Sequence, residues 1–437
     1  MREWVTRPLS VLADIRVSNV DKKSLLGEKP VLLCNYMDVY GNDYIRSDIA
    51  FMEATASEAE IVRFKVDAGD VMITKDSETP DDIGIPAVVM DKIDHLVCGY
   101  HLALLKPRQE FVDPVFLCKQ LASQEATRYF GQRATGSTRY GLSNRTLTNF
   151  LVALPEIAQQ KKIADILRSI DTAIEQTEAL IAKYQQIKAG LMHDLFTHGV
   201  LPNGQLRPPR EQAPELYHET EVGWVSKDWQ PVSLRDLVGS GNIVNGPFGS
   251  DLLTSELKTE GVPVLYVQDI KPGLFSRISR AHVTDQKANE LAFCNVRRGD
   301  VLVAKVGDPP CDSCVYEQDQ RAVVTQDVIR IRPTANVESL YLASMLNSPF
   351  GRKAVKRISI EGTRERVSLT EFKGLTFPIA PTAEQVLIAQ RMSAVHSTIA
   401  SETTKLGKLT RQKRGLMHDL LTGAVPINVE APEVVDG

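Results

Sequence analysis

The sequence contains no apolar run of about 18 residues, and its first residues lack the apolar core of a secretion signal. Neither a membrane-spanning helix nor a signal peptide is therefore expected. Six cysteines among 437 residues are too few for a scaffold held together by disulfides. These absences predict a soluble chain in a reducing, cytoplasmic setting.

The chain also lacks an excess of positive charge, because 51 Lys and Arg stand against 55 Asp and Glu, for a net charge of −4. A protein that is basic over its whole surface is excluded, although local basic patches are not. Hydrophobic residues make up 43% of the chain, which is enough to bury sizeable cores. A chain of this length predicts two domains with connectors.

Catalytic and metal-binding motifs are missing as well. No Walker-type loop, nucleophile elbow or glycine-rich S-adenosylmethionine loop is present. Asp308-Pro309-Pro310-Cys311 resembles the motif with which amino-methyltransferases stack a flipped base, but a cysteine replaces the aromatic residue. Cys311 and Cys314 form one CxxC, and zinc would need two further ligands. His193-Asp194 and His418-Asp419 are neighbours on helices and do not face each other. We expect no catalytic, cofactor-binding or metal-binding residues in this chain.

What the sequence does contain is an internal repeat at a distance of 225 residues. The hexapeptide Gly190–Leu195 recurs as Gly415–Leu420, and Trp4 falls on Trp229. Residues 151–200 match residues 376–425 at fifteen of fifty positions. A duplication of this kind gives one chain two related surfaces, which suits a target that itself has two parts.

Each half is predicted to contain a globular unit of strands and helices. Val71–Thr74 reads as a strand after a Gly-Asp turn, and Val301–Ala304 repeats it. Helical spacing follows from Val112 to Phe130 and again from Val337 to Ser348. The predicted boundaries are 1–150 for the first globular unit, 151–200 for a helical segment, 201–375 for a linker and the second unit, 376–425 for a second helical segment, and 426–437 for a tail.

Two long helices are expected in the segments between and after the units. From Ile163 to Leu191 the seam residues are spaced alternately three and four apart over about four heptads. A helix from Ile157 to Leu195 that carries this seam would span about 58 Å. The second seam is weaker, because Glu402 and Lys413 interrupt it. A lone helix with an apolar seam is unstable in water, so the two helices are predicted to pair antiparallel as a spacer. The alternative is that each helix packs only on its own unit. The residues chosen for the seam and the repeated helix ends are Ile163, Ile170, Leu180, Leu191, Met192, Ile388, Val395, Leu409, Leu416 and Met417.

Basic residues recur in register between the halves. Gly136–Arg139 and Gly362–Arg364 both place an arginine after a flexible turn, where it could approach phosphates or base edges. Seven Lys and Arg residues lie between Arg352 and Lys373. A solvated surface would explain most of these charges, but less readily their recurrence. The candidates for DNA contact are Lys75, Arg139, Phe248, Ser250, Lys305, Arg364 and Arg366.

In combination these features resemble the specificity (S) subunit of type I restriction–modification enzymes. The segments that carry the resemblance are Gly246–Ser250, Gly299–Val303, Leu346–Pro349 with Gly362 following, Ala383–Gln385 and Gly415–Met417. The resemblance as a whole extends over essentially the whole chain. The first half departs from the pattern, because it lacks the Gly-Pro-Phe-Gly-Ser loop and the glycine that follows Lys305-Val306.

The resemblance implies an α+β fold with two target recognition domains, joined by two long helices in a pseudo-two-fold, antiparallel coiled-coil spacer. Each domain would read one half of a split double-stranded DNA site. Two methyltransferase (M) subunits would dock on the helices, and restriction (R) subunits would join them. S-adenosylmethionine would belong to M, and ATP and Mg²⁺ to R.

The sequence therefore predicts a non-catalytic DNA-binding specificity subunit. Two alternatives remain open at this point. One is a DNA methyltransferase or nuclease that acts alone, and the other is a coiled-coil scaffold that binds only proteins.

Overall fold

A computed structural model describes residues 4–220 and 223–428 of the chain. Contacts divide the chain into two compact units, which are described separately below. Unit 1 comprises Met1–Thr177 and Lys405–Gly437, and unit 2 comprises Glu178–Thr404. Each long helix is thus divided between the units, whereas the boundaries predicted from sequence place the helices in segments of their own.

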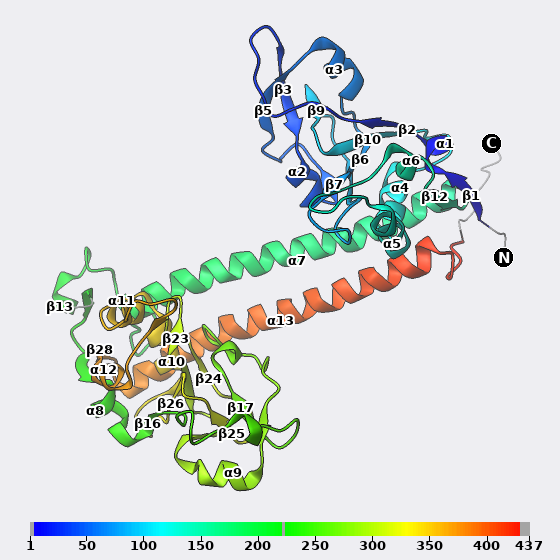
Figure 1. Ribbon diagram of the computed structural model, residues 1–437. Coiled ribbons are helices and arrows are strands. Elements are labelled where there is room, and N and C mark those ends of the chain that lie inside the picture. The colour runs from blue at the N-terminus through cyan, green and yellow to red at the C-terminus, as the bar shows by residue number, and fades with distance from the viewer. Residues whose placement is uncertain (1–3, 221–222, 429–437) are drawn as a thin grey trace, which may run out of the picture. The chain divides into compact units, whose positions relative to one another are not determined.

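Unit 1 is built on a five-stranded sheet with the order β2-β10-β6-β8-β4, beside a three-stranded sheet with the order β5-β3-β9 (Figure 1). Two further strand pairs, β1 with β12 and β7 with β11, complete it. The strands are β1 Val5–Pro8, β2 Ala13–Val17, β3 Lys29–Cys34, β4 Tyr44–Ile45, β5 Met52–Ala56, β6 Val71–Thr74, β7 Asp76–Ser77, β8 Pro86–Val89, β9 Leu96–Cys98, β10 Leu102–Pro107, β11 Tyr140–Gly141 and β12 Leu151–Leu154. The helices are α1 Leu9–Leu12, α2 Tyr36–Tyr40, α3 Glu58–Phe64, α4 Pro114–Leu121, α5 Gln124–Arg133, α6 Asn144–Thr148 and α7 Ile157–Thr197.

The central strands of unit 1 are buried on both faces. Val71 and Ile73 of β6 enter a core shared with α4, α5 and α7, whereas Met72 enters a second core shared with the three-stranded sheet. A strand covered on both faces must be apolar at every position, which explains why this segment reads as a continuous apolar run. The prediction of a strand at Val71–Thr74 is confirmed.

Unit 2 repeats this arrangement. Its four-stranded sheet has the order β16-β26-β22-β24, beside a sheet with the order β20-β17-β25-β21. The strands are β13 Tyr217–Thr220, β14 Gly223–Ser226, β15 Gln230–Ser233, β16 Ile243–Asn245, β17 Val262–Leu265, β18 Ile270–Lys271, β19 Leu274–Phe275, β20 His282–Val283, β21 Asn295–Val296, β22 Val301–Ala304, β23 Val306–Gly307, β24 Ser313–Val315, β25 Ala322–Val324, β26 Val328–Ile331, β27 Glu365–Arg366 and β28 Thr376–Ile379. The α-helices are α8 Leu234–Val238, α9 Asp285–Glu290, α10 Ser339–Asn347, α11 Pro349–Lys356, α12 Leu369–Gly374 and α13 Thr382–Leu421. Short 3₁₀ helices cover Pro214–Leu216, Ser240–Asn242, Thr254–Glu256, Val267–Asp269 and Ala292–Cys294.

The strand orders show that the two units share one fold. β2, β10, β6 and β8 of unit 1 correspond to β16, β26, β22 and β24 of unit 2, and both sets are antiparallel between neighbours. The smaller sheets also agree, because β3 and β9 pair in parallel as β17 and β25 do. The duplication seen in the sequence is therefore a duplication of structure.

One predicted element is wrong in detail. Val112 to Phe130 was expected to form a single helix, but α4 ends at Leu121 and α5 begins at Gln124. Ser123 lies at the break and its hydroxyl accepts a hydrogen bond from the backbone of Ala126, which starts the second helix. Unit 2 has the same break, where Ser348 precedes Pro349 of α11.

The two long helices run antiparallel within each unit. α7 begins at the predicted residue, Ile157, and ends at Thr197. In unit 1 the Gln159 amide donates to the Ile427 carbonyl at 2.9 Å, and Asp171 pairs with Lys413 at 2.7 Å. A later residue of α7 thus contacts an earlier residue of the C-terminal segment, as expected for two antiparallel helices. In unit 2 the backbone N–H of Val200 donates to Glu384 at 2.7 Å.

Within the units α7 and α13 pair with each other and also pack on globular parts, so the alternative that each helix packs only on its own unit is wrong. Ile163 and Ile388 are fully buried in the cores of units 1 and 2, respectively. The other residues chosen for the seam and helix ends are half-buried: Ile170, Leu180, Leu191, Met192, Val395, Leu409, Leu416 and Met417. Within the described ranges, no helix has both the length and the hydropathy to cross a membrane.

Candidate nucleic-acid interface

Three segments of unit 1 meet at one end of its main sheet. Val17 of β2 and Ile73 of β6 both pair with Ala103 of β10, so these two antiparallel neighbours of β10 leave the sheet at the same end. The chain enters β10 there through the turn Gly99–His101. Lys75 therefore emerges beside this turn, and its backbone N–H donates to the carbonyl of His101 at 2.9 Å.

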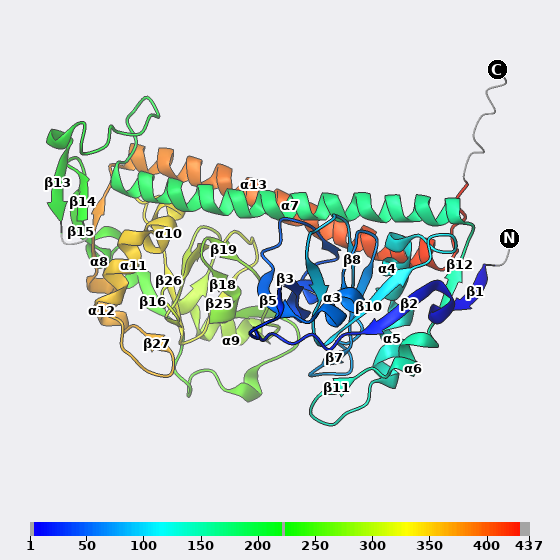
Figure 2. The same cartoon turned by 90° about the horizontal axis from the view of Figure 1, so that it is seen from above.

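A short β-ribbon extends from this end of unit 1. β7 pairs with β11, with Asp76 opposite Gly141, and the N–H of Leu142 donates to the Lys75 carbonyl at 2.8 Å. Figure 2 shows β11 on the side of unit 1 that faces away from α7. Arg139 is exposed just before β11. The ribbon thus brings together Lys75 and Arg139, which lie far apart in the sequence.

The loop before β11 requires its glycine. Gly136 has a φ of 146°, and a Cβ there would lie 2.0 Å from the Arg139 carbonyl oxygen. A side chain at this position would therefore push the arginine turn out of place. The flexible turn predicted from the sequence is in fact a tightly closed one, and this closure holds Arg139 at the tip of the ribbon.

Unit 2 has the corresponding ribbon and more of the candidate residues. β23 pairs with β27, with Val306 opposite Arg366, and the N–H of Val367 donates to the Lys305 carbonyl at 3.2 Å. Arg364 and Arg366 are exposed, and Lys305 is half-buried at the base of the ribbon. Three basic candidates therefore lie on a ribbon built like that of unit 1.

The loop with Phe248 and Ser250 leaves the same end of the unit 2 sheet. Asn245 of β16 and Val303 of β22 both pair with Ile329, so Gly246 and Lys305 follow their strands on either side of β26. A Cβ at Gly246 would lie 2.0 Å from the Val324 carbonyl oxygen, so the loop must pass close to the backbone here. Phe248 is 60% exposed, an unusual position for a large apolar ring.

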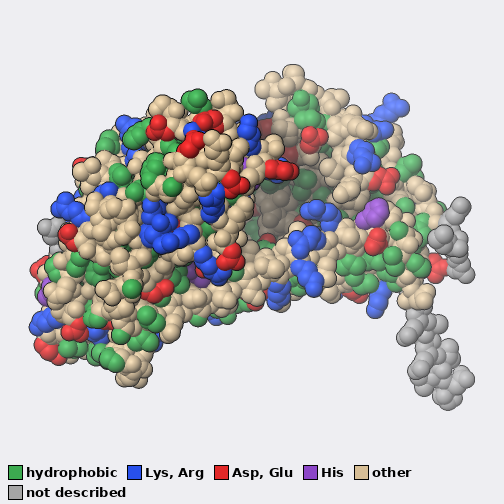
Figure 3. Space-filling view, turned by 90° about the horizontal axis from the view of Figure 1, so that it is seen from below, with side chains coloured by type: hydrophobic (Ala, Val, Ile, Leu, Met, Phe, Trp, Pro, Cys, Tyr) green, Lys and Arg blue, Asp and Glu red, His purple; other side chains and the backbone are tan. Residues whose placement is uncertain are grey.

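Not every basic residue predicted near this site is available for DNA. The Arg352 guanidinium donates to the Pro310 carbonyl at 3.0 Å and to the Asp312 carboxylate at 2.6 Å, and it is half-buried. Arg352 therefore holds the segment after β23 in place. On the face drawn in Figure 3, Lys and Arg side chains form small groups interleaved with Asp and Glu, in line with the near-neutral composition.

Sequence reasoning missed a polar cluster at the same end of unit 1. Nδ1 of His101 lies 2.6 Å from a carboxylate oxygen of Asp76, and the His101 ring lies 4.1 Å from the ring of Tyr100, edge to face. Nζ of Lys75 lies 5.4 Å from the centre of the Tyr100 ring. His101 has a φ of 73°, a left-handed conformation that hydrophobic periodicity does not report.

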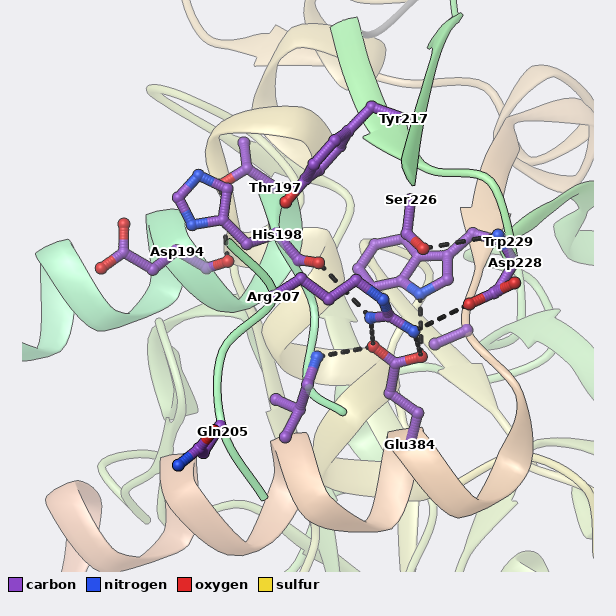
Figure 4. Close-up of polar contacts among 12 residues, drawn as sticks. Asp194, Thr197, His198, Gln205, Arg207, Tyr217, Ser226, Asp228, Trp229 and Glu384 are labelled. Atoms are coloured by element: carbon purple, nitrogen blue, oxygen red, sulfur yellow. Dashed lines mark hydrogen bonds and ion pairs between the residues drawn. The ribbon is translucent and has the colours of Figure 1, made fainter. Parts of the chain in front are cut away.

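The end of α7 is fixed in unit 2 by a buried ion pair (Figure 4). Arg207 and Glu384 are each only 6% exposed, and the guanidinium donates to both carboxylate oxygens. Nε1 of Trp229 donates to the same carboxylate at 3.1 Å. Burial alone would lower the pKa of Arg207, but the hydrogen bonds and charge of Glu384 raise it. Gly199, just after α7, has a φ of 73°, and a Cβ at this position would collide with the side chains of Arg207 and Trp229. The end of α7 therefore requires glycine.

The cysteines of the CxxC are part of the interior. Cys311 and Cys314 are fully buried, and burial raises the pKa of each thiol to about 12. Cys311 lies in the core of unit 2, where it cannot stack on a base. In residues 4–220 and 223–428, no cluster of three or more His, Cys, Asp or Glu side chains is arranged to hold a metal ion.

A family model described as "Type I restriction modification DNA specificity domain" matches residues 1–186 and 226–411. The chain belongs to this family. The two matched segments begin 225 residues apart, which is the distance of the internal repeat. Membership identifies the chain as a type I DNA-specificity subunit, a class of non-catalytic recognition subunits, as predicted from the sequence.

Individual relatives agree with this assignment. The MjaVIII specificity subunit of Methanocaldococcus jannaschii is 21% identical over 420 residues, which are 93% of this chain and 91% of the relative. The EcoBI specificity subunit of Escherichia coli is 23% identical over 68% of this chain and 63% of its own length. The crystal structure of a type I S subunit from M. genitalium has a TM-score of 0.58 at 15% identity, covering 95% and 96% of the two chains. This last likeness shows a common fold.

Proposed function

We propose that this specificity subunit recognises a double-stranded DNA target in two parts, with one part read by each unit. The observation that carries the proposal is the repeated ribbon at the end of the main sheet. Both ribbons follow a lysine at the end of the central strand, Lys75 or Lys305, and both carry exposed arginines from a distant segment. Ribbons of two strands fit the major groove of DNA, where base edges can be read.

We further propose that the chain works in the cytoplasm with two M subunits and with R subunits, and that the paired helices carry their docking surfaces. Half-buried residues near the helix ends, such as Met192 and Met417, would be covered by these partners. The cofactors would then come with the partners: S-adenosylmethionine with M, and ATP and Mg²⁺ with R.

Because α7 and α13 contribute to both units, we propose that they also set the spacing of the two DNA parts. Half-site spacing is a geometric quantity, so a stiff connection is needed to define it. When two domains of modest DNA affinity are linked, binding of one raises the effective concentration of the other at its own half-site, so the overall affinity rises without any new contact. Phosphate contacts by Lys and Arg would make the binding weaken steeply with added salt.

The proposal is tested by footprinting the chain together with its M partner on genomic fragments. We expect protection of two short stretches separated by an unspecified gap. A single continuous footprint would contradict recognition in two parts. Absence of DNA binding with M present would contradict the function as a whole.

The remaining alternative, a scaffold that binds only proteins, predicts a different response to mutation. The triple variant Arg139→Ala, Arg364→Ala, Arg366→Ala should bind DNA at least about 10-fold more weakly and with a shallower salt dependence, since each lost phosphate contact removes about 0.9 from the slope. Association with M, measured by gel filtration, should be unchanged. Arg298 is an exposed arginine at the opposite end of the sheet, just before β22, and Arg298→Ala is the matched control. DNA affinity of the triple variant equal to wild type would favour the scaffold.

A further inference from the structure

The two units place different side chains on one shared frame of backbone hydrogen bonds, at the sheet end that carries the ribbons. In unit 1 three residues, Gly99–His101, connect β9 to β10. In unit 2 three residues, Thr325–Asp327, connect β25 to β26. Both connections join the smaller sheet to the centre of the main sheet, so they are the same turn in two copies.

Hydrogen bonds establish the residue-by-residue correspondence. The N–H of Lys75 donates to the carbonyl of His101 at 2.9 Å, and the N–H of Lys305 donates to the carbonyl of Asp327 at 2.8 Å. The carbonyls of these two lysines then accept from Leu142 and from Val367, each just beyond its ribbon strand. His101 therefore matches Asp327.

The same frame aligns two more pairs of residues. Tyr100 matches Gln326, because each precedes the residue whose carbonyl accepts the hydrogen bond from the lysine N–H. Asp76 matches Val306, because each follows the lysine at the start of its ribbon. At all three pairs the backbone hydrogen bonds that place the lysine are kept and the side-chain chemistry is exchanged, although His101 alone of these residues has a left-handed backbone, with a φ of 73°.

We infer that the residue pairs Tyr100/His101 in unit 1 and Gln326/Asp327 in unit 2 are base-reading positions that give the two units different DNA targets. This inference rests on the function proposed above and names where each unit reads. The ligand at both turns is the edge of a base pair in the major groove of duplex DNA.

The side chains at these turns suit base edges more than phosphates. Asp327 is exposed and carries only acceptors, so phosphates repel it, whereas the amino group of cytosine can donate to it. Gln326 is half-buried beside it and offers the donor and acceptor pair that matches adenine. An exposed carboxylate at the end of a sheet that otherwise presents Lys305, Arg364 and Arg366 is thereby explained.

Unit 1 presents a fixed imidazole in place of the carboxylate. Because the Asp76 carboxylate only accepts, it holds the Nδ1–H of His101 at 2.6 Å, which leaves Nε2 as an acceptor in the neutral ring. Tyr100 is 44% exposed and its ring meets the imidazole edge to face, so it adds an apolar surface beside His101. Asp76 is thus a positioning residue for His101.

The conformation of His101 supports a functional role. A φ of 73° is uncommon for a residue with a side chain and costs free energy that the surrounding structure must supply. Such residues concentrate where a side chain has to be held in one place for binding. Here the left-handed turn accompanies the contacts of His101 with both Asp76 and Tyr100.

Methylome mapping of a host that carries the chain with its M partner gives the test, because it reports both parts of the target at once. The double variant Tyr100→Gln, His101→Asp gives unit 1 the side chains of unit 2. It should change the bases specified in one part of the DNA target and leave the other part as in wild type. The reciprocal transplant, Gln326→Tyr with Asp327→His, should change only the other part. The controls are Lys92→Gln and Arg298→Gln, at exposed sites that follow β8 and precede β22 at the opposite ends of the sheets.

Milder variants keep the test decisive if a transplant fails to fold. Asparagine tolerates a left-handed backbone, so His101→Asn should fold and bind M normally, and should relax the preference at one base pair by roughly 10-fold or more. Asp76→Asn should relax the preference at the same base pair without a change in the melting temperature of the protein. Asp76→Glu should restore this base preference. A purely structural role for Asp76 would instead change the melting temperature and leave the base preference intact.

Two outcomes separate this inference from the function on which it rests. If the wild-type chain specifies a two-part motif and His101→Asn and Asp327→Asn leave both parts unchanged, the base-reading positions are wrong and the function stands. If the wild-type chain specifies no two-part motif, the function itself fails, and the inference fails with it.

Discussion

Glu384 and Gln159 occupy matching positions of the repeat, and they bind different groups. Glu384 holds the buried guanidinium of Arg207 and the indole of Trp229, whereas the Gln159 amide donates to the Ile427 carbonyl. A carboxylate is required where a guanidinium is buried, because an unpaired buried charge is costly. A neutral amide is sufficient where only a carbonyl has to be satisfied.

Replacing Glu384 should therefore destabilise unit 2 strongly. Glu384→Gln removes the buried counter-ion of Arg207 and leaves only the exposed carboxylate of Asp228, so we expect a loss of about 3 kcal/mol or more in the free energy of unfolding. Urea unfolding at neutral pH measures this loss. The matched control is Asp228→Asn, which removes the other carboxylate bound to Arg207 but lies at a side chain that is 67% exposed. We expect the control to cost less than about 1 kcal/mol. Equal effects of the two variants would refute the buried pair as the main contribution.

Single residues of the candidate site were predictable only where a linear pattern marked them. Lys75 follows an apolar strand, and Arg139 follows a glycine turn, so both could be found from spacing. His101 and Asp76 could not, because their contact depends on a left-handed backbone and on two strands that meet in space. The fold places these residues together without any local signal for it.

The paired helices show that an interruption of the apolar seam has a structural cause. Lys413, which breaks the predicted seam, pairs with Asp171 at 2.7 Å and with Asp43 at 2.9 Å. Asp171 also binds Lys119, which is almost completely buried. Burial opposes ionisation of Asp43, but the charges of Lys119 and Lys413 outweigh it and lower the pKa of that carboxyl to about 2. A polar seam position is thus used to fix the register of the two helices in unit 1.

The matching position in unit 2 should make stability depend on pH. His396 replaces Asp171 in the repeat and lies beside Lys188, and burial together with the Lys188 charge lowers the pKa of His396 to about 4 from an ordinary value near 6.5. The unfolded chain then binds more protons than the folded chain between these values, so stability is lost as the pH falls from about 6.5 to about 4. We expect a loss on the order of 1–2 kcal/mol across this range, measured by urea unfolding.

The variant His396→Gln provides the comparison for this pH dependence. It should reduce the loss of stability of unit 2 between about pH 6.5 and 4. The pH dependence of the stability of unit 1 should not change, because Asp171 faces Lys413 there instead. If the decline persisted undiminished in His396→Gln, another group would be responsible for it.

The elements themselves were largely predictable, apart from their ends and breaks. The long helix was predictable because the heptad seam from Ile163 to Leu191 extends over many turns, and its predicted first residue, Ile157, is the observed start of α7. The break between α4 and α5 was missed, since apolar spacing continues across it and only the capping residue Ser123 marks it. The ribbons β7–β11 and β23–β27 were missed because two-residue strands leave no periodic pattern.

At the scale of the whole molecule, each long helix serves both units. α7 passes from unit 1 to unit 2 after Thr177, and α13 passes back after Thr404. The duplication therefore did not produce two separate domains, because each unit needs helix segments from both halves of the chain. The sequence repeat predicted two related units, but this exchange of helix segments depends on long-range pairing that the repeat alone does not specify.

An insertion in the helices should test their role as a spacer. Seven residues added after Thr177 and seven added after Thr404 would lengthen both helices by about 10 Å and nearly preserve their facing sides. We expect the gap between the two parts of the DNA target to lengthen. An insertion in α7 alone shifts its pairing with α13 and should abolish recognition.

The control for this experiment is the same seven residues inserted between Gln318 and Asp319, in an exposed loop away from the ribbons. This variant should keep the wild-type gap. A wild-type gap and full activity in the doubly lengthened protein would contradict the spacer role.

The shared helices also have a consequence for synthesis on the ribosome. Unit 2 contains only residues 178–404, but unit 1 needs Leu420 and Leu421 in its core and Lys413 for its buried charges. Nascent domains generally fold in the order in which they emerge. Here the unit that is translated first is the one that must wait longest for its missing segment, and the unit that is translated second has all of its residues earlier. Completion of the fold therefore runs opposite to the direction of translation.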